Sequence, residues 1–195
     1  TAKLIKNMGF DGIDINMGCP DRSIEKQGAG AAMMKDIARA KEIVEAARRG
    51  SGLPVSVKTR IGYHKNQMEE WLAALLSMKL PALTVHLRTR KEMSKVAAHW
   101  DLMPNIVEMA KGTGTLIIGN GDVKDLDDAK NKARETGADG IMLGRAIFGN
   151  PWLFNRKIKY QDIPVKERLR VMMEHTRLFE KKLGGVKNFA IMKKH

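Results

Sequence analysis

Five short apolar runs recur along the chain, and a loop and then a helical pattern follow each of the first four. The runs are residues 12–16, 54–58, 82–86, 115–119 and 140–144. Each has the length and the Ile, Val and Leu content of a buried strand. Strands that alternate with helices pair in parallel through right-handed crossovers. The pattern therefore predicts an α/β fold built on a parallel sheet.

Capping residues indicate where the helices between the runs begin and end. Asp36 precedes a helical pattern that ends near Gly50, and Asp125 precedes another that ends near Gly137. Aspartate accepts hydrogen bonds from the free N–H groups of a first helical turn, and glycine is common after the last turn. Residues 2–8 are also expected to be helical. A further apolar stripe at helical spacing comprises Met68, Trp71, Leu72, Leu75 and Leu76.

The spacing of the runs fits either a (β/α)8 barrel or a doubly wound sheet. No G-x-G-x-x-G motif joins a run to the next helix, which disfavours a dinucleotide-binding doubly wound sheet. Polar residues and glycines follow the runs, at the strand ends where barrel enzymes build their sites. A whole barrel needs eight units in about 250 residues, whereas residues 1–150 hold about five. We therefore predict a partial TIM barrel and, since the chain begins at Thr1, part of a longer protein.

The pattern changes after residue 150. Asp162 and Pro164 suit a helix start, and residues 151–195 contain 12 Lys and Arg against four Asp and Glu, a net charge of +8 out of +13. We predict that this region begins a second, α-helical domain whose basic surface meets a polyanion. Another barrel helix and a merely solvated surface are the alternatives. The apolar face expected to pack against a core includes Leu169, Met172, Met173 and Phe179.

Composition excludes several classes of protein. Hydrophobic residues make up 43% and charged residues 29% of the chain, as in ordinary globular proteins. The single cysteine, Cys19, excludes an intramolecular disulfide and favours the cytoplasm. No apolar run approaches 18 residues, so we expect no membrane span. No histidines have the spacing of metal ligands, so we expect no metal site, and we expect a monomer.

Three side chains near strand ends are candidates for chemistry. Cys19 lies in the tight turn Asn16–Pro20, where a thiol can act as acid, base or nucleophile; a small buried hydrophobe is the alternative. Lys58 closes the second run, and can hold an anion or a cofactor carbonyl unless it extends to the surface. His86 closes the third run, and Arg88 points to the same side two residues on. This pair suits a phosphate or a flavin edge, although a single strand histidine is usually structural.

Two glycine clusters follow the last two runs. They are residues 119–122, Gly-Asn-Gly-Asp, and residues 144–146, Gly-Arg-Ala. Barrels often bind phosphate between the loops after their last strands and a short helix. Glycine lets backbone N–H groups approach the oxygens, and Arg145 adds positive charge. Each cluster alone is a weak signal, because turns need glycine, but two at consecutive strand ends predict a phosphate site.

Taken in order, these motifs resemble those of the tRNA-dihydrouridine synthases. The stretches that carry the resemblance are residues 14–20, 26–31, 57–60, 85–90, 119–122 and 143–146. The family combines an FMN-binding TIM barrel with a helical domain that holds tRNA. The resemblance implies reduction of uridine to 5,6-dihydrouridine, with NADPH reducing the flavin. The family's Ala-Pro-Met first strand and the Gln of its third strand are not found in this chain, and Leu87 replaces a usually small residue.

The resemblance also implies roles for individual residues. Cys19 corresponds to the general acid that protonates C5 of the uracil, and Lys58 and His86 correspond to flavin contacts. Arg88 corresponds more weakly to the surface between flavin and substrate. The residues that match the phosphate and ribityl side of the FMN site are Asn120, Gly121, Asp122, Gly144 and Arg145.

The basic segment after residue 150 is expected to meet the phosphates of tRNA. The residues predicted to make these contacts are Arg170, Arg177 and Lys181. Two other functions remain open at this point. One is a different FMN barrel oxidoreductase, of the dihydroorotate or dihydropyrimidine dehydrogenase type. The other is a non-catalytic RNA-binding remnant.

Overall fold

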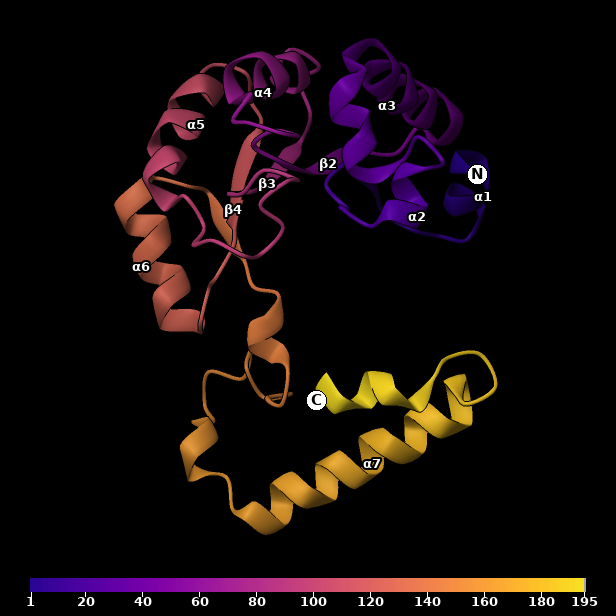
Figure 1. Cartoon of the computed structure of the whole chain (residues 1–195), viewed down its shortest axis with the longest axis vertical. Coiled ribbons are helices and arrows are strands. Elements are labelled where there is room, and N and C mark those ends of the chain that lie inside the picture. The colour runs from indigo at the N-terminus through magenta and orange to yellow at the C-terminus, as the bar shows by residue number, and fades with distance from the viewer. Residues whose placement is uncertain (195) are drawn as a thin grey trace.

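A parallel sheet of five strands forms the centre of the computed structural model, which describes residues 1–194 (Figure 1). The strands are β1 (Ile13–Asn16), β2 (Val55–Arg60), β3 (Ala82–His86), β4 (Leu116–Asn120) and β5 (Gly140–Met142). Each strand pairs in parallel with the next one in the sequence. A doubly wound sheet reverses its strand order at a switch point, and this sheet does not. All five predicted strands are confirmed, and they form five consecutive β/α units of a partial TIM barrel.

Helices follow the strands and pack outside them. The helices are α1 (Ala2–Asn7), α2 (Arg22–Glu25), α3 (Ile37–Ser51), α4 (Met68–Leu76), α5 (Met103–Ala110), α6 (Leu126–Thr136) and α7 (Val165–Leu183). Short 3₁₀ helices are η1 (Gly30–Lys35), η2 (Trp100–Leu102), η3 (Arg145–Ile147), η4 (Tyr160–Asp162) and η5 (Phe189–Lys194). Figure 1 shows α3 to α6 as an arc around the strands. A helix was expected after the third run, but the position of α5 was not predicted, because it begins without a side-chain cap.

The predicted caps form as expected. Asp36 accepts a hydrogen bond from the backbone N–H of Arg39 at 2.9 Å, and Asp125 accepts two, at 3.0 and 2.8 Å, from the first turn of α6. Gly137 ends α6 in the left-handed region with φ 74°. Helix α3 runs to Ser51 and not to Gly50, because Gly52 adopts the left-handed conformation that ends it.

The core lies between the sheet and its helices. Alternate strand residues such as Val57, Leu83 and Ile117 are fully buried there. All five apolar residues of α4 that the sequence singled out are buried against them, and burying each large side chain stabilises the fold by about 1.5–3 kcal/mol. Because side chains alternate along a strand, Lys58 points to the opposite face. That face carries the polar groups of the site.

The C-terminal region is built differently. Figure 1 shows α7 and η5 side by side, below the sheet. Phe179 is the one buried residue of α7, and its ring meets that of Phe189 edge-on at 5.9 Å. Leu169, Met172 and Met173 are about half exposed. The prediction that they pack against a core is therefore wrong within residues 1–194, because η5 is too short to cover the apolar face of α7.

The boundary predicted at residue 150 falls in the connection between β5 and α7, and residue 195 lies outside the described part of the chain. The helix predicted after Pro164 is confirmed as α7. Among residues 1–194, no helix combines the length and the apolar character needed to cross a bilayer.

Candidate active site

The carboxyl ends of four strands form one row of residues. The register pairs Arg60 with His86, His86 with Asn120, and Asn120 with Met142. Lys58 lies two residues before Arg60, and its Nζ donates to Asn120 Oδ1 at 3.2 Å. Asn120 Nδ2 donates in turn to the carbonyl of Met142 at 2.9 Å. The sheet thus brings Lys58, His86 and Asn120 together, and Lys58 does not extend to the surface.

Positive charge is concentrated in this row. Burial lowers the pKa of Lys58, and the neighbouring Arg60 lowers it further, with Asp14 acting in the opposite direction. Burial and then Arg88 lower the pKa of Arg60 to about 10. At about 10 the pKa of Arg60 still leaves its guanidinium charged at neutral pH. An anionic group placed here would relieve the repulsion between Lys58 and Arg60.

His86 is neutral at physiological pH. Burial lowers its pKa to about 3, and repulsion by Arg60, Lys58 and Arg88 adds to the effect. Its Nε2 lies 3.3 Å from Arg88 Nη1. A guanidinium can only donate, so Nε2 is the acceptor and the ring proton is on Nδ1. His86 can therefore donate one hydrogen bond from Nδ1 without adding a charge.

Asp122 joins the loops that follow β3, β4 and β5. Its carboxylate accepts the backbone N–H of Ala98 at 2.9 Å and Arg145 Nη2 at 2.9 Å, and it pairs with Arg88. The Arg88 hydrogen bond is the main reason why the pKa of Asp122 is lowered. Arg88 is only 2% exposed and also donates to the carbonyl of Val96 at 2.7 Å. The structure therefore places Arg88 inside the loops, with Arg145 nearer the solvent.

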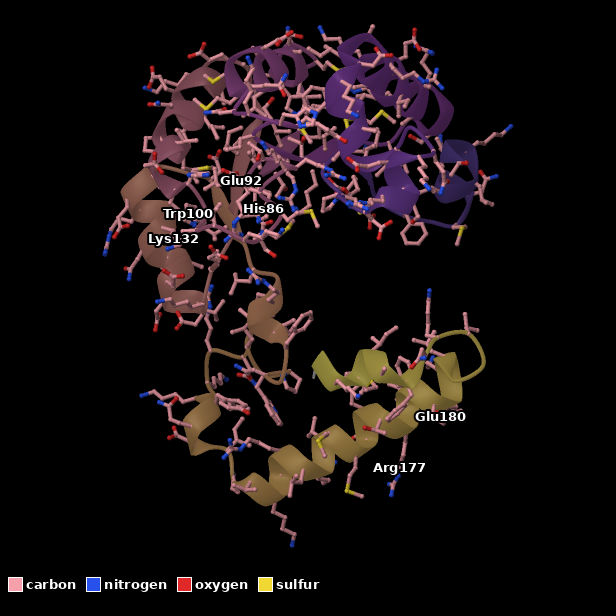
Figure 2. All side chains as sticks on the ribbon, in the orientation of Figure 1. His86, Glu92, Trp100, Lys132, Arg177 and Glu180 are labelled. Carbon is pink, nitrogen blue, oxygen red and sulfur yellow. The ribbon has the colours of Figure 1, made fainter. Side chains whose placement is uncertain are left out.

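The two glycine clusters line one cavity of about 430 Å³, as their positions at neighbouring strand ends suggested. The lining residues are His86, Asn120, Gly121, Asp122, Val123, Gly144, Arg145 and Ala146. A Cβ on Gly144 would meet no atom within 4 Å, so the backbone there faces open space. Gly121 has φ 132°, and a Cβ on it would come within 2.7 Å of Ala98. Figure 2 shows His86 among the side chains gathered at these strand ends.

Cys19 is a half-buried free thiol in the loop after β1. Asn16 Oδ1 accepts the backbone N–H groups of Gly18 and Cys19, each at 3.0 Å, which fixes the turn. The chain then folds back, and Ala31 N–H donates to the carbonyl of Cys19 at 2.9 Å. Gly30, with φ 60°, has no room for a side chain, because a Cβ would lie 2.7 Å from that carbonyl.

Asn16 and Arg60 belong to the site but were not singled out from the sequence. Asn16 was read only as a neighbour of Cys19, although an asparagine two residues before a glycine is a signal for a side-chain turn. Arg60 was read only as part of a motif. Its spacing of two from Lys58 places both on one side of the strand, but its partners are far away in sequence.

The basic residues proposed on α7 lie apart from this row. Arg170 forms ion pairs with Glu167 at 2.7 Å and with Glu174 at 3.1 Å on the same helix. Arg177 and Lys181 are exposed, and Figure 2 shows Arg177 pointing away from the sheet. Among residues 1–194, no cluster of three or more His, Cys, Asp or Glu side chains is placed to hold a metal ion.

A barrel sheet with basic side chains and a glycine-lined cavity at its carboxyl edge has the layout of an enzyme that binds a phosphate-bearing ligand. Comparison with known sequences defines the family. Residues 1–195 match the family described as dihydrouridine synthase (Dus), and the chain belongs to that family.

Named relatives agree with this assignment. A "probable tRNA-dihydrouridine synthase" of Staphylococcus epidermidis is 42% identical over 180 residues, which cover 91% of this chain and 54% of the relative. A protein of the same name from Staphylococcus aureus is 41% identical over 184 residues, covering 93% and 55%. "Probable tRNA-dihydrouridine synthase 2" of Bacillus subtilis is 43% identical over 176 residues, covering 89% and 53%. The chain spans about half the length of these curated relatives.

Proposed function

We propose that the protein reduces uridine in tRNA to 5,6-dihydrouridine, using FMN that NADPH has reduced. Membership of the dihydrouridine synthase family along the whole chain carries this proposal. The relatives named above are described as acting on tRNA, in the words of their names. A cytoplasmic, monomeric enzyme without a metal remains our expectation from the sequence.

The residues present fit FMN. The cavity of about 430 Å³ has an open glycine backbone at Gly144 and a guanidinium at Arg145, which suits a phosphate. Asn120, Gly121 and Asp122 would face the phosphate and ribityl side, where Asp122 keeps Arg145 in place at 2.9 Å. When bound, FMN supplies the hydride for C6 of the uracil.

Lys58 and His86 would contact the flavin ring. Lys58 is held toward Asn120 by its 3.2 Å hydrogen bond, so its ammonium has a fixed direction. His86 offers Nδ1–H as a neutral donor, because Nε2 is occupied by Arg88. One charged and one neutral donor on the same edge suit the carbonyl and nitrogen acceptors of an isoalloxazine.

Cys19 would give the proton to C5 of the uracil. The turn fixed by Asn16 holds the thiol at the carboxyl edge of β1, beside the row that ends β2 and β3. The proton leaves Sγ, and the resulting thiolate is reprotonated from solvent. Arg88 would support the surface between flavin and substrate from within, and Arg170, Arg177 and Lys181 would meet tRNA phosphates.

The test is dihydrouridine formation in tRNA by the complete protein, purified with its cofactor and supplied with NADPH. We expect a bound flavin by absorbance and dihydrouridine by mass spectrometry of the digested tRNA. Turnover of a free pyrimidine but not of tRNA would favour the dihydroorotate type of FMN barrel instead. Binding of RNA without a flavin would favour a non-catalytic protein.

A further inference from the structure

Arg60 ties the Cys19 loop to the loop that follows β3. The side chain is 8% exposed and lies at the end of β2, between the two loops. Its Nε donates to the carbonyl of Gly18 at 2.9 Å. Its Nη1 donates to the carbonyls of Thr89 at 3.1 Å and Met93 at 3.0 Å. One buried guanidinium therefore fixes the residue next to Cys19 relative to a segment about 70 residues further along the chain.

A second tie joins the same two loops further out. Arg90 forms a two-pronged ion pair with Glu25 of α2, in which Nε donates to Oε1 at 2.8 Å and Nη2 meets Oε2. The side chains of Arg90 and Glu25 are 22% and 10% exposed. The ring of Tyr63 supports the pair, with its centre 5.4 Å from Arg90 Cζ. Bidentate pairs of this kind fix orientation as well as distance.

The two ties lie on either side of the thiol. Gly18 immediately precedes Cys19, and α2 begins three residues after it, at Arg22. Gly18 also packs directly on β2, since a Cβ there would lie 3.1 Å from the backbone of Thr59. The segment that carries Cys19 is thus held at both ends, while Cys19 itself is only partly buried.

We propose that Arg60 is a positioning residue for Cys19, and that the Glu25–Arg90 pair is the second anchor of the same loop. Neither side chain has to touch the substrate. Their effect on catalysis rests on the proposed function, in which the thiol must reach one carbon of a uracil. Their effect on the position of the thiol does not depend on the proposed function.

The chemistry of arginine explains why this residue and not another occupies the end of β2. Its planar fork donates in several fixed directions, so that Nε and Nη1 can serve carbonyls from two loops at once. A lysine keeps the charge but has a single ammonium that cannot span both. Arg60→Lys therefore removes the planar guanidinium while leaving a cation near Lys58 and His86. The variant thus distinguishes the positioning effect of Arg60 from the effect of its charge.

The first experiment measures how accessible the thiol is. In the complete protein, without tRNA, iodoacetamide labelling of Cys19 is followed over time by mass spectrometry of the peptide that contains it. We expect Arg60→Lys and Glu25→Gln each to speed labelling several-fold. Arg48→Lys is the matched control, because Arg48 also donates to a distant carbonyl, that of Lys79 at 3.1 Å, but on the far side of α3.

Unchanged labelling in both loop variants would overturn the proposal, and so would equal acceleration in Arg48→Lys, which would indicate general loosening. If Arg60→Lys does not fold, labelling of Glu25→Gln alone tests whether the Cys19 loop is anchored, since the Glu25–Arg90 pair is nearer the surface.

The second experiment separates the two half-reactions by rapid mixing. We expect Arg60→Lys to leave flavin reduction by NADPH unchanged and to slow flavin reoxidation by tRNA, by up to about 10²-fold for a displacement near 1 Å. The loss is expected in kcat, with the KM for tRNA unchanged. Equal slowing of both half-reactions would contradict a positioning role. If labelling changes but the parent protein does not act on tRNA, the proposed function fails and the positioning of the thiol stands.

Discussion

The sheet region, up to β5, and the C-terminal region around α7 handle charge in opposite ways. In the sheet region two arginines near the strand ends are enclosed and hydrogen-bonded: Arg60 donates to three carbonyls, and Arg88 is 2% exposed beside Asp122. On α7 the side chains of Arg177 and Lys181 project from an exposed helix. The first arrangement holds its side chains in fixed directions, whereas the second leaves them exposed to solvent.

Apolar residues show the same contrast. Helix α4 buries a whole apolar face, and its Leu72 is fully enclosed, whereas Leu169 of α7 is 50% exposed. Ion pairs on α7, such as Arg170 with Glu167, are solvent-exposed and contribute about 0–1 kcal/mol each. Substitutions in the sheet region should therefore have much larger effects than substitutions on α7.

The largest expected effect concerns Cys19. Cys19→Ala should slow uracil reduction by about 10²–10⁴-fold, because the proposed general acid is lost. Flavin reduction by NADPH should be unchanged, since the thiol has no part in it. Rapid-mixing absorbance follows the two half-reactions separately. A variant that reoxidises its flavin with tRNA as fast as the parent would exclude Cys19 as the acid.

A matched pair of leucine substitutions compares the two regions directly. Leu72→Ala leaves a cavity in a packed core and should cost about 2–5 kcal/mol of unfolding free energy. Leu169→Ala should cost at most about 1 kcal/mol, because half of that side chain already meets solvent. Urea unfolding of the complete protein, followed by circular dichroism, measures both. Equal losses would show that the face of α7 around Leu169 is buried in the complete protein.

The pH dependence of stability tests His86. The unfolded histidine binds its proton below about pH 6.5, whereas burial keeps the pKa of folded His86 near 3. The unfolded state then binds more protons, so stability should fall as the pH drops from 6.5 toward 3, by at most about 1.4 kcal/mol per pH unit. His86→Asn should flatten this slope above pH 5.

Below that pH, carboxylates with lowered pKa values, such as Asp122 and Glu25, add losses of the same sign. The difference between the parent and His86→Asn in the interval between pH 6.5 and 5 therefore reports on His86. An identical slope in parent and His86→Asn over that interval would show that the imidazole is solvated and free to take up a proton.

Local signals accounted for most of the fold. Strand length, the apolar stripe of α4 and the caps at Asp36 and Asp125 are all set by neighbours within a few residues, and all are confirmed. The position of α5 could not be predicted, because this helix begins at Met103-Pro104 without a polar cap. The spacing of apolar residues on α7 predicted a packed face, but only Phe179 is buried, because amphipathicity defines a face and not what covers it.

Only those site residues that lie at the ends of paired strands could be grouped from the sequence. Parallel pairing brings consecutive carboxyl ends to one edge, so the amino-acid sequence alone suffices to group Lys58, His86 and Asn120. It does not suffice for the contacts of Arg60 with Gly18 and Met93, because they depend on how two loops fold over the edge. The pairing of Arg170 with Glu167 and Glu174 could have been predicted, because the two glutamates lie three and four residues away on the same helix.

The smallest effect is expected on α7 and concerns salt. Replacing Arg170, Arg177 and Lys181 together with Ala should weaken tRNA binding, since each phosphate contact releases counterions and contributes about 0.7–0.9 to the log–log slope against salt. Arg170 is already paired with Glu167 and Glu174, so the slope should flatten by about 1.4–1.8, from two contacts. Arg170→Ala alone should change it least. Titrations of tRNA at several salt concentrations measure the slopes, and flavin content, which should stay constant, is the control. An unchanged slope in the triple variant would show that this charge is only a solvated surface and that tRNA is held by other residues.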